Sequence, residues 1–232
     1  PSSATRDEPT MTLATPSPEA DTRPDDATRR PRPPWLRLLA IGVAGIALLA
    51  GAGWLVLQWL TPHPYSGTVM QAPTAAPSMD GLVWDDGTPV DVSRLGGELV
   101  LVYFGYTACP DVCPTTMVSV DRALDEIGED VDRVRVVMIS IDPARDDPAR
   151  VGEYVRSFDP AFRGVSGSVE DVERVASTYG IYFAQDEPLE GGGYTMSHTS
   201  TLLGIDPDGH LRIVWPSVLD PEALAADITE LL

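Results

Sequence analysis

The stretch LVLVYFGYTACPDVCPTTM, residues 99–117, carries the clearest structural signal in the chain. Its first six residues are continuously apolar, with β-branched and aromatic side chains, which is typical of a central strand buried on both faces. Residues 115–127 then place apolar side chains at helical spacing, and Pro114 suits the first turn of a helix. The two cysteines, Cys109 and Cys113, therefore lie at a strand-to-helix junction.

The segments that follow alternate between strand and helix patterns. Residues 134–141 (VRVVMISI) are predicted to form a second buried strand. Asp147 is followed by Pro148, and Ser168 opens a capping-box-like sequence, so each residue is predicted to begin a helix. Asp220 is predicted to cap a last helix that runs to the C-terminus.

Two short apolar segments near the C-terminus, residues 201–205 and 211–215, flank the turn sequence Asp-Pro-Asp-Gly. Pro presets φ and Gly tolerates positive φ, so this sequence predicts a β-hairpin. The alternation over residues 79–232 predicts an α/β domain with a central mixed sheet and helices on both faces. Because the cysteines fall at a strand-to-helix junction, we expect a thioredoxin-like fold.

Acidic residues are concentrated in the C-terminal part of the chain. The 232 residues carry a formal net charge of −19, with 16 basic against 35 acidic side chains. Residues 1–60 hold six basic and six acidic side chains, which leaves ten and 29 for residues 61–232. Such an acidic surface repels phosphate backbones, so no nucleic-acid partner is expected. Cations or positively charged proteins are favoured instead.

Residues 38–57, LLAIGVAGIALLAGAGWLVL, form an uninterrupted run of 20 apolar residues. At 1.5 Å per residue, a helix of this length can cross a hydrocarbon core of roughly 30 Å. We therefore predict a transmembrane helix over residues 36–60 that binds the lipid bilayer. Arg residues precede the run, whereas residues 61–79 contain no Arg or Lys. The positive-inside rule then predicts a single-pass protein of the cell membrane, with a cytoplasmic N-terminus and an extracytoplasmic domain.

The segments on either side of the apolar run lack apolar periodicity. Residues 1–34 are rich in Pro, Ser, Thr, Ala and charge, which predicts a disordered cytoplasmic tail. Residues 61–78 hold four Pro among small residues, which predicts an extended tether. A cleavable signal peptide is the alternative to an anchor, because residues 50–52 (AGA) resemble a cleavage site, although the apolar run continues through Leu57. Both interpretations export the domain.

Three residues separate Cys109 from Cys113. A disulfide that closes so short a loop removes little chain entropy, so a purely structural bridge is a weak explanation. A helix N-terminus favours the thiolate, which is the form that attacks disulfides and binds metals. Two sulfurs and one imidazole suit Cu(I), or Cu(II) with an added oxygen, whereas structural zinc ordinarily takes a fourth protein ligand. Redox or metal chemistry is therefore predicted.

Histidine would have to complete such a metal site, and the chain has three. His63 lies in the predicted tether and His210 in the predicted turn. His198 follows three consecutive glycines, residues 191–193, and precedes a strand, so we expect it on a loop that can move toward the cysteines. An isolated histidine is most often a surface or packing residue, so the residues alone leave the role of His198 open.

Three segments in the same order carry a resemblance to a known family. They are FGYTACPDVCPTTM at 104–117, SIDPARDDP at 140–148 and SHTSTLLGIDPDGHL at 197–211. They resemble, in turn, the Cys-x-x-x-Cys-Pro signature, the Asp-Pro-x-x-Asp segment and the histidine strand with Asp-Pro-Asp-Gly of the Sco family. This family, also called SenC, comprises membrane-tethered copper proteins of cytochrome c oxidase assembly. The resemblance covers residues from about 80 to 232.

The resemblance implies that Cys109, Cys113 and His198 bind copper, as Cu(I), Cu(II) or both. It implies an inserted β-hairpin near the histidine. It further implies a membrane-anchored metallochaperone that delivers copper to the copper centre of cytochrome c oxidase. The expected partners are the oxidase subunit that holds this centre and other copper chaperones or thiol reductases. Met196-Ser197 stands where the family more often has Val-Asp, which leaves any acidic neighbour of His198 open.

The alternative function is a thiol-disulfide oxidoreductase that uses Cys109 and Cys113 as a redox dithiol and keeps the oxidase subunit's cysteines reduced. The spacing of three residues, and the lack of Pro immediately before Thr199, argue against a general reductase. Whether the chain is an enzyme stays open at this point. A sensor that signals through the membrane is less favoured, because the N-terminal tail is short. Asp142 and Asp146 are expected to serve in turns or caps.

Overall fold

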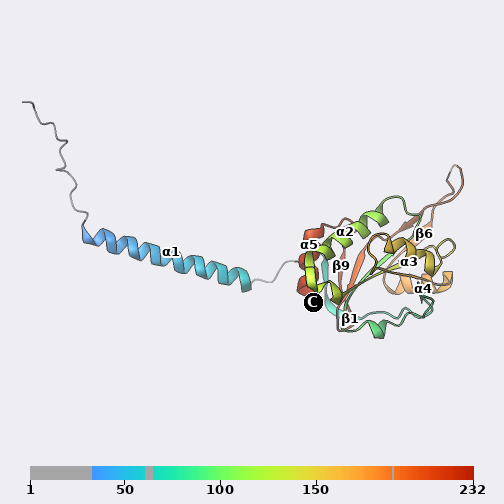
Figure 1. Cartoon of the computed structure of the whole chain (residues 1–232), viewed down its shortest axis with the longest axis horizontal. Helices are drawn as coiled ribbons and strands as arrows, with labels where there is room; N and C mark the ends of the chain where they lie inside the picture. The colour runs from blue at the N-terminus through green and yellow to red at the C-terminus, as the bar shows by residue number, and fades with distance from the viewer. Residues whose placement is uncertain (1–32, 61–64, 190) are drawn as a thin grey trace, which may run out of the picture. The chain divides into compact units, whose positions relative to one another are not determined.

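The computed structural model describes residues 33–60, 65–189 and 191–232 and divides into two compact units. The first contains α1, Pro34–Leu60, which matches the predicted transmembrane helix and begins two residues earlier (Figure 1). Its segment Pro34–Leu57 is long and apolar enough to cross a membrane. The predicted tail, residues 1–34, lies almost wholly outside the described residues.

The second unit is built on a seven-stranded mixed sheet. The strand order is β1-β9-β8-β3-β4-β5-β2. Strands β3, β4 and β5 run parallel, and the outer strands pair antiparallel. The bounds are β1 Thr68–Ala75, β2 Val83–Trp84, β3 Leu99–Gly105, β4 Val134–Ser140, β5 Arg163–Ser166, β8 Leu202–Ile205 and β9 His210–Trp215. A separate two-stranded sheet pairs β6, Phe183–Gln185, with β7, Met196–His198.

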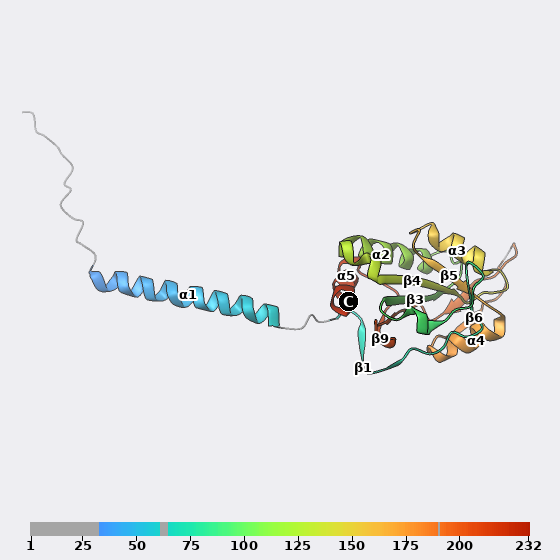
Figure 2. The same ribbon diagram turned by 60° about the horizontal axis from the view of Figure 1, so that its bottom comes forward.

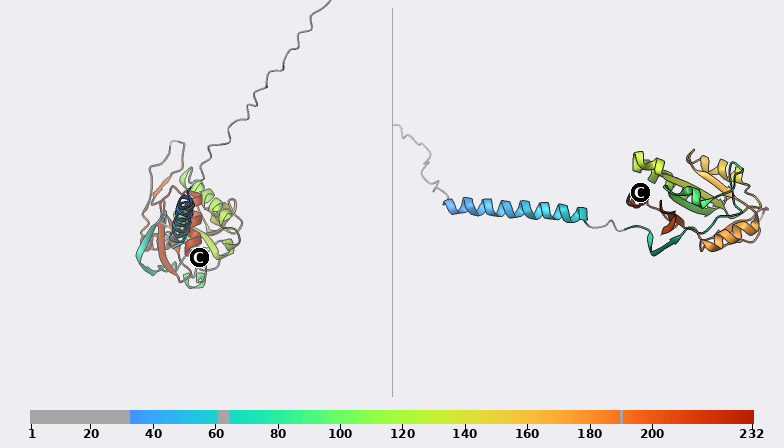
Figure 3. Two further views of the ribbon diagram at one scale, coloured as in Figure 1. Left: turned by 90° about the vertical axis from the view of Figure 1, so that its left-hand side faces the viewer. Right: turned by 90° about the horizontal axis from the view of Figure 1, so that it is seen from below.

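Helices cover both faces of the sheet, as the sequence predicts. In Figure 2, α2 and α3 lie on one side of the strands and α4 lies on the other, and the right-hand view of Figure 3 agrees. Helix α5 packs against α2. The bounds are α2 Val112–Ile127, α3 Pro148–Arg156, α4 Val169–Thr178 and α5 Pro221–Leu231, with short 3-10 turns at Val92–Leu95 and Gly128–Arg133.

Local sequence explains these elements directly. All seven residues of β3 are buried, which accounts for its continuous apolar run. The predicted N-caps are confirmed, because the side chains of Asp147, Ser168 and Asp220 accept hydrogen bonds from the first turns of α3, α4 and α5. Helix α2 begins at Val112, so Pro114 lies in its first turn as predicted, together with Cys113.

The predicted tether is wrong for most of its second half. Thr68–Ala75, inside the range 61–78, forms β1 and pairs with β9. The sequence favoured a tether because the segment contains Pro73, and Pro has no amide hydrogen to donate within a sheet. Pro73 is tolerated because β1 is an edge strand whose register shifts between Val69 and Thr74. The folded unit therefore begins before residue 79.

A buried carboxylate on α5 fastens the residues just before β1. Asp227 is fully buried and accepts hydrogen bonds from the Ser66 amide at 3.0 Å, the Ser66 hydroxyl at 2.6 Å and Trp215 Nε1 at 2.7 Å. Burial would raise the pKa of Asp227, but the hydrogen bonds from Ser66 and Trp215 outweigh it and hold that pKa below its usual value. The ionised carboxylate therefore joins the start of the domain to its last helix.

Replacing Asp227 with Asn keeps the shape and removes the charge. We expect the free energy of unfolding at pH 7 to fall by about 3 kcal/mol, because hydrogen bonds to charged groups contribute about 1.5–3 kcal/mol each. The lowered pKa means that this contribution is present above about pH 4 and is lost as the pH falls through the folded-state pKa. Urea titration of the full chain in detergent at several pH values measures both effects.

As the pH falls below about 4, the free energy of unfolding of Asp227→Asn should therefore decrease less than that of the parent. Glu153→Gln, at an exposed position on α3, is the matched control and should unfold like the parent. Equal unfolding midpoints for the two variants would contradict the structural role of Asp227.

Candidate functional site

The cysteine loop leaves the carboxyl end of β3 and enters α2. The Cys109 amide donates to the Tyr106 carbonyl at 3.2 Å, which closes the turn. Asp146, 1% exposed, accepts from the Thr107 amide at 2.9 Å, the Thr107 hydroxyl at 2.6 Å and the Ser140 hydroxyl at 2.7 Å. Asp146 was expected in a turn or cap, and the structure shows it holding the loop that carries Cys109.

Gly105 allows Cys113 to pack against the end of β3. A Cβ atom at this position would lie 2.7 Å from Tyr103 Cε1 and 3.1 Å from Cys113 Sγ. The first distance is shorter than real carbon contacts, so any larger residue would displace the ring or the sulfur. Sequence reasoning missed this requirement, because a single glycine at a strand end is also compatible with an ordinary turn.

The two cysteines are both free and differ in exposure. Cys109 is 9% exposed and Cys113 is fully buried. The Cys113 amide donates to Cys109 Sγ at 3.4 Å. The hydrogen bond from the Cys113 side chain, helped by His198 and opposed by burial, holds the pKa of Cys109 well below its usual value. The same hydrogen bond and burial raise the pKa of Cys113. Cys109 is thus the thiolate near the surface, and Cys113 is the protonated partner behind it.

His198 is the last residue of β7, so its expected position on a loop is wrong. Pairing of β7 with β6 places Phe183 opposite His198 and holds the backbone along one edge of β7. A strand of three residues has too little periodicity to be predicted from sequence. The glycines at 191–193 all have positive φ and form the turn of this β6–β7 hairpin.

The imidazole of His198 faces the cysteines. Its Nε2 atom lies 3.8 Å from Cys113 Sγ, while Nδ1 lies 3.2 Å from the Thr199 carbonyl oxygen. A carbonyl only accepts hydrogen bonds, so the proton of a neutral ring belongs on Nδ1, and the Nε2 lone pair faces the cysteines with the Ser200 hydroxyl 3.4 Å away. The rings of Tyr103 and Tyr106 pack edge-on against the imidazole, with centroids 6.2 and 6.1 Å away.

The spacing of the donor atoms suits a shared metal ion. Metal–nitrogen and metal–sulfur bonds of about 2.0 and 2.3 Å at a trigonal angle put the two ligands about 3.7 Å apart. Cys113 Sγ and His198 Nε2 lie 3.8 Å apart, close to this separation. Among the residues that the structure describes, no three His, Cys, Asp or Glu side chains already form a complete metal-holding group.

Asp111 is exposed and precedes α2 at its N-cap position. Its side chain makes no cap hydrogen bond within the described part of the chain. Its backbone amide contributes to the lowered pKa of Cys109. The aspartate between the cysteines therefore acts on the sulfur through its main chain.

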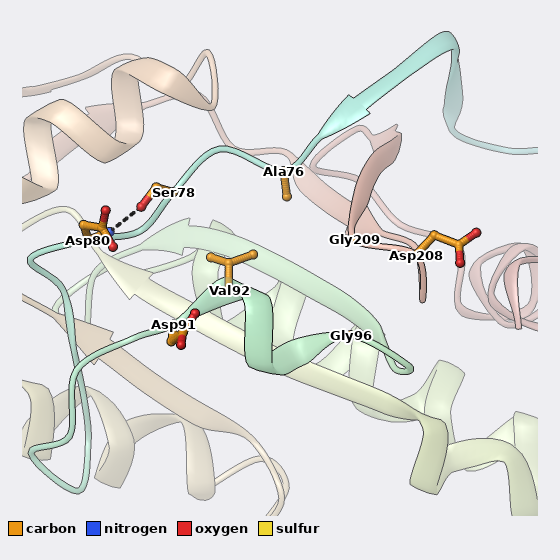
Figure 4. A pocket seen from close by; sticks show the side chains of 8 residues that line it. All are labelled: Ala76, Ser78, Asp80, Asp91, Val92, Gly96, Asp208 and Gly209. Atoms are coloured by element: carbon orange, nitrogen blue, oxygen red, sulfur yellow. Dashed lines mark hydrogen bonds between the residues drawn. The ribbon is translucent and has the colours of Figure 1, made fainter.

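A surface pocket of about 400 Å³ lies apart from this site, beside the turn between β8 and β9 (Figure 4). It is lined by Ala76, Ser78, Asp80, Asp91, Val92, Gly96, Asp208 and Gly209. In Figure 4 the Ser78 hydroxyl accepts a hydrogen bond from the Asp80 amide, at 3.1 Å. None of the three predicted site residues contributes to this pocket.

Comparison with known proteins identifies the family that the domain resembles. The SCO1/SenC family model matches residues 79–232. Human mitochondrial "Protein SCO1 homolog" is 31% identical over 209 residues, which cover 87% of this chain and 68% of that protein. "Protein SCO1 homolog 1, mitochondrial" of Arabidopsis thaliana is 36% identical over 146 residues, which cover 60% and 43%. The chain thus spans less than half of the length of the plant relative.

A solved structure supports the same assignment. Bradyrhizobium japonicum ScoI, described with copper bound, is 35% identical, with a TM-score of 0.60 over 69% of this chain and 98% of that one. The predicted thioredoxin-like fold, with a mixed sheet, helices on both faces and an inserted hairpin, is confirmed. From residue 79 to its C-terminus, this chain belongs to the SCO1/SenC family.

Proposed function

We propose that this chain is a copper-binding assembly factor that holds copper through Cys109, Cys113 and His198. The observation that carries the proposal is the 3.8 Å approach of His198 Nε2 to the sulfur of Cys113, which is itself hydrogen-bonded to Cys109. Two thiolate sulfurs and an imidazole are soft and borderline ligands that suit Cu(I). The copper-bound relative from Bradyrhizobium japonicum supports the choice of metal.

Transfer of copper to a partner would proceed by exchange of ligands. Cys109 lies nearest to the surface, so its sulfur is the ligand that an incoming thiol or imidazole can replace first. Cys113 and His198 would hold the ion until the partner supplies further ligands. The acidic surface of the domain, with 29 acidic against ten basic side chains in residues 61–232, favours the approach of cationic cargo.

The recipient in this proposal is the copper centre of cytochrome c oxidase, in the subunit that holds it. Other copper chaperones or thiol reductases would load or reduce the site. Helix α1 would anchor the chain in the cell membrane as a single span. The Arg residues before α1 favour a cytoplasmic N-terminus and an extracytoplasmic copper domain.

Replacing His198 with Ala should weaken copper binding by at least about 100-fold, because the loss of an outer-sphere partner already costs 10–100-fold and His198 is a direct ligand. The measurement is a competition titration with a chelator on the full chain in detergent, with both thiols kept reduced. Thiol titration should still find two free cysteines in this variant.

The matched control is His210→Ala, since His210 is the first residue of β9, beside Asp206 and not in the turn where it was expected, and it is not among the proposed ligands. This variant should bind copper like the parent. If His198→Ala also retained the parental affinity and spectrum, His198 would not be a copper ligand.

Thiol-disulfide exchange is the second candidate function, and the asymmetry of the cysteines favours it. The Cys109 thiolate would attack a substrate disulfide and release one substrate sulfur as a thiolate. Cys113 would then lose its proton and attack Cys109 in the mixed disulfide, which releases the second substrate sulfur. The substrate gains two electrons, and Cys109 and Cys113 become a disulfide.

This second function needs the sulfurs and not the imidazole. We expect the His198→Ala variant to reduce an oxidised peptide from the oxidase subunit's copper site within about threefold of the parental rate, whereas Cys109→Ser should abolish turnover. Stopped-flow thiol release measures both rates. The exchange mechanism would be contradicted if His198→Ala lost the thiol-release rate while Cys109→Ser kept it.

The proposed sidedness can be tested with one engineered thiol. Val218 is 87% exposed, so Val218→Cys in a chain whose two native cysteines are replaced by Ser gives a single accessible sulfur. A membrane-impermeant maleimide should label this variant in cells whose cytoplasmic membrane is intact. Labelling that appears only after the cytoplasmic membrane is opened would place the domain in the cytoplasm.

A further inference from the structure

An arginine outside the proposed ligand set joins the β6–β7 hairpin to the loop after β4. Arg145 Nη1 donates to the Tyr194 carbonyl at 2.9 Å, and its guanidinium lies 3.7 Å from the centre of the Tyr194 ring. Its Nε atom is paired with the carboxylate of Asp142. One side chain thus contacts both a strand end of the main sheet and the hairpin that carries His198.

Tyr194 also contacts Asp142, the partner of Arg145. The Tyr194 hydroxyl donates to Asp142 Oδ1 at 2.8 Å. Asp142 is only 3% exposed, and Arg145 and Tyr194 supply hydrogen bonds to its carboxylate in place of water. Asp142, Arg145 and Tyr194 are therefore in mutual contact, and we refer to them as the Arg145 clamp.

The clamp reaches His198 through a neighbouring ring. The Arg145 guanidinium also lies 5.8 Å from the centre of the Tyr106 ring, which packs edge-on against the imidazole. Tyr106 contacts the hairpin too, because its hydroxyl accepts a hydrogen bond from the Met196 amide at 3.3 Å. Arg145 therefore contacts the hairpin directly at Tyr194 and approaches Tyr106, the residue that contacts both Met196 and the imidazole.

Tyr106 belongs to the cysteine loop, but that loop is also held by two groups outside the Arg145 clamp. Asp146 binds the Thr107 amide and hydroxyl, and Gly105 sets how closely Cys113 packs. A change in the Arg145 clamp should therefore move the imidazole and leave the two sulfurs in place. This separation allows the role of the clamp to be measured independently of thiol chemistry.

We propose that Arg145 is a positioning residue for copper retention: together with Asp142 and Tyr194 it fixes the hairpin, and so the distance of His198 Nε2 from Cys113 Sγ. The inference rests on the proposed copper-binding function. Lys cannot replace Arg here, because an ammonium lacks both the planar face that stacks on Tyr194 and the fork that binds two acceptors at once.

The test compares Arg145→Lys with Arg174→Lys. Arg174 has the same pattern of contacts elsewhere, with an ion pair to Asp171 three residues earlier and a hydrogen bond to the Asp80 carbonyl. Both changes keep the charge, and the control site lies on α4, away from the cysteines. Each variant is prepared as the full chain in detergent, both without metal and loaded with Cu(I).

The first readout needs no copper. The amides of Asp186, Met196 and Thr199 are hydrogen-bonded within or beside the hairpin. In Arg145→Lys we expect their hydrogen exchange to be about tenfold faster, because the hairpin opens more easily, while amides of β8 and β9 are unchanged. Arg174→Lys should leave the hairpin amides at the parental rate.

The second readout is copper retention. Transfer of Cu(I) to a chelator should be about 10–100-fold faster from Arg145→Lys than from the parent or Arg174→Lys. The midpoint potential of the Cys109–Cys113 disulfide should stay at the parental value in both variants.

Parental exchange and parental copper release in Arg145→Lys would overturn the proposal. So would faster hairpin exchange with unchanged copper release, or a shifted disulfide potential, since either result separates the clamp from the position of His198. Failure of the proposed function is a distinct outcome, in which the parent itself retains no copper.

Discussion

The site depends on one buried carboxylate that joins the carboxyl ends of the three parallel strands. Asp146 accepts hydrogen bonds from Thr107 after β3 and from Ser140 at the end of β4, and its backbone carbonyl accepts one from Ser166 at the end of β5. A buried carboxylate is tolerated only when such donors replace water. Because the same residue holds the turn before Cys109, the position of that sulfur is set by the sheet and not by the loop alone.

The elements that sequence predicted correctly are those with strong local signals. The buried strands β3 and β4 are predicted correctly because each contains a run of apolar residues. Asp147, Ser168 and Asp220 mark helix starts because each side chain accepts a hydrogen bond from a backbone amide of the first turn. These patterns depend only on residues that are close in sequence, so they can be recognised without knowing the tertiary structure.

The elements that sequence missed depend on distant partners. Strand β1 contains Pro73 and is stabilised by pairing with β9, more than 130 residues later, so its local pattern indicates a tether. The strand that ends at His198 has three residues and exists because β6 lies beside it. The spacing and position of the cysteines predicted their role, whereas the prediction for His198 rested mainly on resemblance to a family.

The hydrogen bonds from Ser66 to Asp227 limit where a soluble fragment of the domain can begin. The family match begins at residue 79, which suggests a natural boundary for an expression fragment. A fragment cut there would lack β1, leave β9 as a bare sheet edge and remove the Ser66 donors from a buried charge. An unpaired edge next to an unsatisfied carboxylate favours strand-to-strand aggregation. The soluble unit that preserves this sheet begins near residue 62, where the second compact unit of the chain begins.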